Sequence, residues 1–213
     1  RSGGLMASGD TYKVVIHGRQ THGALPWNGV DPITIASQII TSAQSIVSRQ
    51  VDLTLTPAIV TVGYIRGGVR VNIIPDSVEF GGTIRTFDET TRDSIRTKFT
   101  RLITTMAEAN GAKANITFDR GTPVTYNDPA LTEKMAPSLR RELGAGQVEV
   151  GRQTTTSEDY SLYQKKVPGV FYFLGVTPKG TDPAKVAPNH SPRFFADEAA
   201  LVPGVKALST LAL

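Results

Sequence analysis

Four side chains in this sequence are suited to binding a metal ion or an anion: His22, Asn72, Arg85 and His190. An imidazole can ligate a metal or donate a hydrogen bond, a guanidinium can hold both oxygens of a carboxylate, and an amide adds a neutral donor. A hydrolytic zinc site needs imidazole and carboxylate ligands and a position left open for water. The chain has only 3 histidines and no cysteine, and no trio of ligands spaced for zinc can be found.

Each of these residues also has an ordinary structural explanation. His22 could make a local contact in its loop, Arg85 could face solvent on a half-buried strand, and His190 could lie at the surface beside a proline turn. His17 continues the alternation that starts at Tyr12, so we assign it to strand structure.

The acidic pair Glu158-Asp159 could act as a general base or could open a helix. Acidic residues are favoured near the positive end of a helix dipole, which supports the second interpretation. A serine nucleophile at Ser157 is not supported, because no serine lies in a Gly-x-Ser-x-Gly motif.

The composition is that of a soluble globular chain: 213 residues, 39% hydrophobic, 20% charged, with a formal net charge of +4. Basic residues are scattered among 19 acidic ones without a basic run, so we predict no nucleic-acid partner. No stretch approaches the roughly 20 apolar residues of a membrane helix, so we predict no membrane partner. The compartment, cytoplasm or periplasm, stays open.

The first part of the chain has the pattern of an α+β fold. Strand-like runs cover residues 11–18, 58–65, 77–87 and 112–118, and helical spacing covers about 31–49 and 90–110. Asp31 and Pro32 are expected to begin the first helix, and Asn110-Gly111 to end the second. The β-α-β-β-α-β order predicts a ferredoxin-like antiparallel sheet with two helices on one face.

After Thr122-Pro123 the pattern changes to an incomplete α/β segment. Helices are expected near 129–143, near 158–165 and from about Asp197, with short strands near 148–150 and 170–174. Two strands are too few for a stable open sheet. We therefore predict one domain at 10–122 and part of a second at 1–9 and 123–213.

Six motifs occur along the chain in a fixed order: residues 18–26, 31–33, 71–76, 82–87, 157–161 and 190–194, the last followed by Asp197-Glu198. Together they resemble the two-zinc aminoacylase and carboxypeptidase family that includes hippurate hydrolase, the indoleacetyl-amino-acid hydrolases and the glutamate-releasing carboxypeptidases. The resemblance covers nearly the whole chain. It implies that residues 10–122 form a lid that also dimerises, and that the rest belongs to the metallohydrolase catalytic domain.

The resemblance also assigns roles to residues. It implies that His190 is a metal ligand, that His22 reaches a partner subunit's site to stabilise an oxyanion, and that Asn72 and Arg85 hold a substrate carboxylate. Glu158 and Asp159 correspond to a pair that orders the wall of the site.

The family's remaining zinc ligands and its Glu-Glu pair have no counterpart here. We therefore expect the lid and C-terminal part of a zinc-dependent amidohydrolase or metallopeptidase for N-acyl amino acids or small peptides, working as a homodimer. This chain alone is expected to be inactive without an N-terminal half and not to retain zinc. The alternative is a non-catalytic dimerisation or binding module.

Overall fold

The computed structural model describes residues 1–212, and the chain divides into two compact units. The sheet unit comprises Gly4–Thr125 and Gln153–Lys166. The helical unit comprises Arg1–Gly3, Tyr126–Arg152 and the chain from Val167 onward. The division into domains at residues 10 and 122 stays a prediction.

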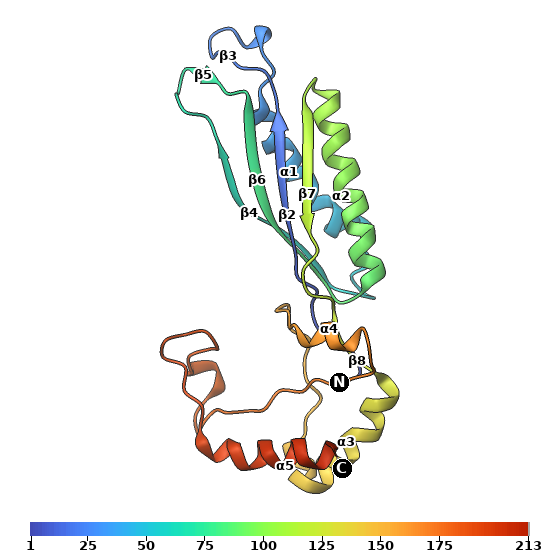
Figure 1. Cartoon of the computed structure of the whole chain (residues 1–213). Coiled ribbons are helices and arrows are strands. Elements are labelled where there is room, and N and C mark those ends of the chain that lie inside the picture. The colour runs from blue at the N-terminus through green and yellow to red at the C-terminus, as the bar shows by residue number, and fades with distance from the viewer. Residues whose placement is uncertain (213) are drawn as a thin grey trace. The chain divides into compact units, whose positions relative to one another are not determined.

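Four antiparallel strands form the sheet of the sheet unit (Figure 1). They are β2 (Asp10–His17), β4 (Ala58–Gly67), β6 (Ser77–Thr86) and β7 (Lys113–Asp119), in the order β4-β6-β2-β7. Asp10 lies opposite Ile84 and His17 opposite Ser77, so β2 and β6 run antiparallel along their whole length. The predicted antiparallel pairing of the strands near 58 and 77 is confirmed.

Two helices, α1 (Pro32–Gln50) and α2 (Glu89–Ala109), contact each other and the sheet. The Asp31 side chain accepts hydrogen bonds from the first turn of α1, and Gly111 after α2 has a φ of 74°, as the local sequence predicts. The buried core between helices and sheet includes Val14, Ile16, Ile39, Ile46, Phe80, Ile84, Ile95, Phe99 and Ile103. The ferredoxin-like α+β fold with two helices on one face is therefore confirmed.

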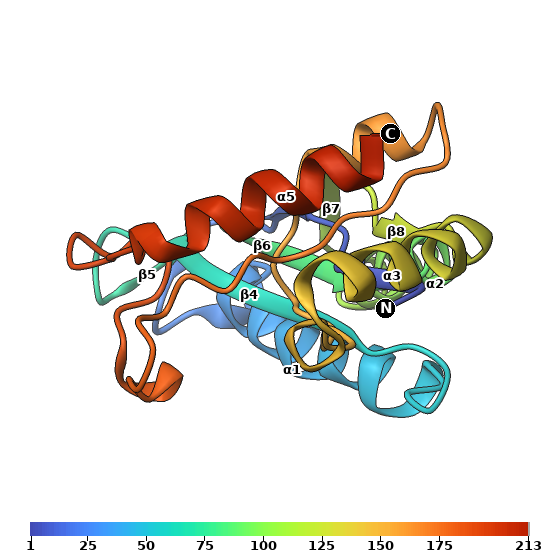
Figure 2. The same ribbon diagram turned by 90° about the horizontal axis from the view of Figure 1, so that it is seen from below.

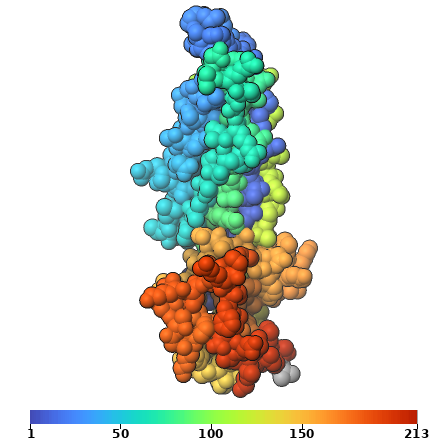
Figure 3. All heavy atoms as spheres, turned by 90° about the vertical axis from the view of Figure 1, so that its left-hand side faces the viewer, coloured from blue at the N-terminus to red at the C-terminus, as the bar shows by residue number. Residues whose placement is uncertain are grey.

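Two loops at the His17 end of the sheet form a surface that we call the tip, residues 18–30 and 68–76. There β3 (Thr21–His22) pairs antiparallel with β5 (Ile73–Ile74), and η1 (Pro26–Asn28) follows β3. Figure 3 shows the two loops against each other at one end of the sheet unit. The sequence pattern predicts neither β3 nor β5, because a two-residue strand has no periodicity to detect.

Two helices pack together in the helical unit: α3 (Pro129–Leu143) and α5 (Leu201–Ala212) (Figure 2). Short 3₁₀ turns lie at η2 (Ala145–Gln147), η3 (Pro183–Lys185) and η4 (Glu198–Ala200). The Asp197 side chain caps η4, which leads directly into α5, so the helix expected from about Asp197 is present. A separate two-stranded ladder joins β1 (Gly3–Met6) and β8 (Thr125–Asn127).

The strands predicted near 148–150 and 170–174 are wrong, because neither segment belongs to a β-ladder in the described chain. An apolar run forms a strand only where a neighbouring strand takes up its backbone hydrogen bonds. The Asn127 side chain instead accepts from the Phe171 amide at 2.7 Å and donates to its carbonyl at 2.8 Å. The helix predicted at 158–165 is the shorter α4 (Tyr160–Gln164). None of the helices within residues 1–212 combines the length and the apolar character of a membrane-spanning segment.

Candidate functional site

His22 presents an imidazole N–H at the tip. Its ring is exposed, and Nδ1 accepts a hydrogen bond from the Ala24 amide at 3.0 Å. A ring nitrogen that accepts a hydrogen bond carries no proton, so in the neutral imidazole the proton is on Nε2. In its neutral form, His22 therefore offers Nε2–H as a donor on the exposed surface of the tip.

Asn72 lies beside His22. The Gly23 amide donates to the Asn72 carbonyl at 2.8 Å, and His22 is opposite Ile73 in the β3–β5 ladder. A Cβ at position 23 would come within 3.2 Å of the Asn72 carbonyl atoms, so glycine permits this close approach. The fold therefore brings His22 and Asn72 together on one exposed surface.

Arg85 lies at the opposite end of the same sheet. It is opposite Ile59 near the end of β6, whereas Ser77 at the start of β6 adjoins the tip. Eight residues of extended strand span on the order of 26 Å at ~3.3 Å per residue. Within one chain, Arg85 and Asn72 do not hold the same carboxylate, although the resemblance implies that both bind it.

The surroundings of Arg85 are polar but carry no opposite charge. Nη1 donates to Ser157 Oγ at 2.8 Å, and no carboxylate of the described residues forms an ion pair with this guanidinium. A half-buried arginine without a counter-ion favours an anionic ligand, because desolvating its charge is costly. No local pattern in the sequence connects Ser157 with Arg85, because 72 positions separate them.

Glu158 and Asp159 open α4, in the part of the chain that belongs to the sheet unit. Glu158 Oε1 accepts from the Asp159 amide at 3.0 Å, and the Ser161 hydroxyl donates to the Glu158 carbonyl at 2.6 Å. These contacts agree with the helix-opening interpretation of the pair. A role in ordering the wall of a site stays a prediction.

His190 lies in the helical unit, in a turn where the Ser191 amide donates to the Pro188 carbonyl at 3.1 Å. Its φ of 70° is in the left-handed region, which is uncommon for non-glycine residues and recurs at functional sites. Within residues 1–212, no group of three or more His, Cys, Asp or Glu side chains could hold a metal. His190 is thus a single candidate ligand, and these residues do not fit a complete zinc site.

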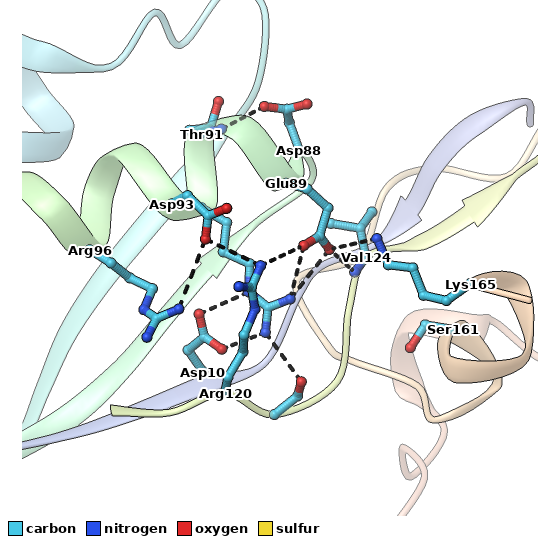
Figure 4. Close-up of polar contacts among 12 residues, drawn as sticks. Asp10, Asp88, Glu89, Thr91, Asp93, Arg96, Arg120, Val124, Ser161 and Lys165 are labelled. Carbon is cyan, nitrogen blue, oxygen red and sulfur yellow. Dashed lines mark hydrogen bonds and ion pairs between the residues drawn. The ribbon is translucent and has the colours of Figure 1, made fainter. Parts of the chain in front are cut away.

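A buried charge network, which the sequence analysis missed, lies at the Asp10 end of the sheet (Figure 4). Arg92 Nε donates to Asp10 Oδ2 at 2.9 Å, and both side chains are buried, with exposures of 1% and 0%. Glu89 accepts from Arg92 Nη1 at 3.2 Å and from the Val124 amide at 3.0 Å, and Lys165 Nζ lies 3.8 Å from its Oε1. The network joins β2, α2, the chain after β7 and Lys165, which directly follows α4.

The network shifts the acidity of its members. Burial by itself raises the pKa of Glu89, but the Val124 amide and the positive charges of Arg92 and Lys165 outweigh burial and lower it. Arg92 lies three residues before Ile95 and seven before Phe99, on the apolar stripe of α2. A charged residue in that position is the signal that could have indicated a buried partner.

Comparison with known proteins gives consistent matches. The profile of the peptidase dimerisation domain matches residues 9–110. N-acetyl-L-cysteine deacetylase of Bacillus subtilis (strain 168) is 39% identical over 202 residues, which are 95% of this chain and 46% of that protein. Thermostable carboxypeptidase 2 of Saccharolobus solfataricus is 33% identical over 214 residues, covering 100% of this chain and 53% of that protein.

A solved structure agrees with these relatives. The Bacillus subtilis YXEP protein, described as a dinuclear metal binding peptidase from the M20 family, matches with a TM-score of 0.79 at 30% identity. The match covers 100% of this chain and 51% of that one, so the chain spans about half the length of the proteins it resembles. Fold, domain profile and relatives agree: the chain carries an M20 peptidase dimerisation domain, and its relatives are M20-family amidohydrolases and peptidases.

Proposed function

We propose that this chain forms the lid and the C-terminal part of a zinc-dependent amidohydrolase that acts as a homodimer on N-acyl amino acids or small peptides. The observation that carries the proposal is the His22 ring, which is exposed at the tip with Nε2–H free to donate. A fixed N–H donor of this kind stabilises the oxyanion that develops when an amide carbonyl is attacked. Arg85, which has no counter-ion among the described residues, would bind the substrate carboxylate.

The separation of His22 from Arg85 supports a dimer. If both residues act on one small substrate, they must come from different subunits, because a β-strand of on the order of 26 Å lies between them in one chain. Asn72 lies beside His22 and would enter the partner's site with it. A two-fold dimer makes this exchange reciprocal, so each subunit supplies a tip and receives one.

The zinc site would need ligands besides His190, because residues 1–212 contain no group of three or more side chains that could hold a metal ion. Apolar side chains exposed on α5 and nearby, such as Leu201, Val205 and Phe173, support a larger catalytic domain around the helical unit. The Bacillus deacetylase and the Saccharolobus carboxypeptidase support the amide-hydrolysing chemistry. The acyl group and the amino acid are left open.

Subunit complementation tests this proposal in an active form of the protein that includes the metal ligands. His22→Ala alone should lower kcat on the order of 100-fold to 1,000-fold. Mixing His22→Ala with Arg85→Ala subunits should restore about a quarter of the wild-type activity. Half of the dimers then contain one subunit of each variant. In each of these dimers, one of the two sites has both an intact His22 and an intact Arg85, and the other site has neither.

A mixture that stays as inactive as its components, although mixed dimers form, would show that His22 and Arg85 do not work across a dimer. Equal turnover of wild type and His22→Ala would refute the oxyanion role itself.

The alternative proposal is a dimerisation or binding module without catalysis of its own, which the dimerisation domain at 9–110 supports. Both proposals predict a dimer in sedimentation experiments, so a strict monomer at high concentration would count against both. Activity in the complementation assay separates them.

A further inference from the structure

The Arg85 guanidinium is held from one side only. Its Nη1 donates to Ser157 Oγ at 2.8 Å, and no other described residue accepts a hydrogen bond from it. Arginine has five N–H donors in a rigid plane, so fixing one of them orients the others. The acceptor at Ser157 therefore decides where the remaining donors of Arg85 are directed.

The segment just before Ser157 is held by backbone hydrogen bonds to the start of the chain. The Ala7 amide donates to the carbonyls of Thr154 and Thr156 at 3.1 and 3.0 Å, and the Thr154 amide donates to the Leu5 carbonyl at 3.0 Å. These bonds attach the segment before Ser157 to β1. A backbone-anchored hydroxyl is a more rigid support for a guanidinium than a side chain on a free loop.

Gly9 makes room for this contact. A Cβ at position 9 would lie 2.9 Å from Ser157 Oγ, 3.0 Å from Thr122 Oγ1 and 3.1 Å from Arg85 Nη1. Three polar atoms from separate parts of the sheet unit thus converge on a backbone position without a side chain. A larger residue at position 9 would crowd the contact between Ser157 and Arg85 without removing the charge of the guanidinium.

We infer that Ser157 is a positioning residue, which acts through Arg85 to aim the guanidinium at the substrate carboxylate, and that Gly9 permits this arrangement. The inference rests on the proposed function, in which Arg85 binds that carboxylate. It predicts that Ser157 determines selectivity for substrates with a free carboxylate, although it does not take part in the attack on the amide.

The test compares an N-acetyl amino acid with its carboxamide, which lacks the negative charge, in an active form of the protein that includes the metal ligands. Ser157→Ala should raise KM for the acid about 10-fold, the effect of losing one hydrogen bond to a charged group, and leave kcat nearly unchanged. KM for the carboxamide should not change. Ser157→Thr keeps the hydroxyl and should restore KM for the acid.

Gly9→Ala is the second variant, because its Cβ would crowd both Ser157 Oγ and Arg85 Nη1 and the substitution removes no polar group. It should reproduce the rise in KM for the acid alone. Ser48→Ala is the matched control, since the exposed Ser48 hydroxyl donates only to the Gln44 carbonyl of its own helix, at 3.1 Å. This variant should behave as wild type with both substrates.

The outcomes separate the inference from the proposed function. If Arg85→Ala does not distinguish the acid from the carboxamide, the carboxylate role of Arg85 fails and the inference fails with it. If Arg85→Ala distinguishes them and Ser157→Ala does not, only the inference on Ser157 is overturned. A Ser157→Ala effect that is equal for both substrates, or that Ser157→Thr does not restore, would also overturn it.

Discussion

Replacing Asp10 by alanine should destabilise the sheet unit strongly, because it leaves a buried guanidinium without its main partner. Arg92 is 1% exposed and directs both Nε and Nη2 at the Asp10 carboxylate. Water cannot replace the lost acceptor at a site that is closed to solvent. Breaking a buried ion pair by removing one partner typically costs about 3–5 kcal/mol.

The structure places Asp10→Ala at the lower end of that range. Arg92 Nη1 keeps Glu89 at 3.2 Å, and Nη2 keeps the Gly121 carbonyl at 3.2 Å. We therefore expect a loss of about 3 kcal/mol in the free energy of unfolding. The double variant Asp10→Ala/Arg92→Met removes the charge together with its partner and should recover most of the loss.

Urea unfolding followed by circular dichroism measures these differences. Asp93→Ala is the control, because the Asp93 side chain is itself exposed, in ion pairs with the half-buried Arg96 at 3.9 Å and the exposed Arg120 at 3.2 Å. Such pairs contribute at most about 1 kcal/mol. A loss below about 1 kcal/mol for Asp10→Ala, or a double variant less stable than the single one, would refute the reasoning.

Further predictions concern Gly82, the pH dependence of Glu89 and the activity of the chain by itself. Gly82→Ala should lower the free energy of unfolding by about 1–3 kcal/mol in urea titrations, because its Cβ would lie 1.7 Å from the Thr61 carbonyl oxygen; unchanged stability would contradict this. The fold lowers the pKa of Glu89, so its carboxylate should stabilise the protein above its unfolded pKa of about 4.3. This contribution should be lost as the pH falls through the folded pKa. In Glu89→Gln, the free energy of unfolding should therefore fall less steeply with decreasing pH. Residues 1–213 alone should not hydrolyse N-acyl amino acids with added zinc, since His190 is a lone candidate ligand, and turnover by the pure chain would refute this expectation.

Local sequence signals were sufficient to predict the four long strands and the two helices of the sheet unit. The alternation from Tyr12 to Ile16 and the helical spacing from Ile95 to Ile103 correspond to buried faces of β2 and α2. Asp31 begins a helix as expected, because its side chain satisfies amides only two and three positions away. Interactions within a few residues can be read from the residues themselves.

The same reasoning failed where a strand needed a distant partner. The apolar run at 170–174 has strand-like composition, but a side chain, that of Asn127, takes up the backbone groups of Phe171. Conversely, β3 and β5 form a ladder although each has only two residues. Composition does not reveal which segment lies alongside another.

By itself, then, the sequence determined the order of strands and helices, the caps of the helices and a set of residues able to bind anions and metals. Only the tertiary structure decided that His22 and Asn72 lie together, that Arg85 lies at the far end of the sheet and that Ser157 supports it. The physical reason is the range of the interactions. Periodicity and capping act over a few residues, whereas these groupings depend on strand register and on contacts between segments far apart in the chain.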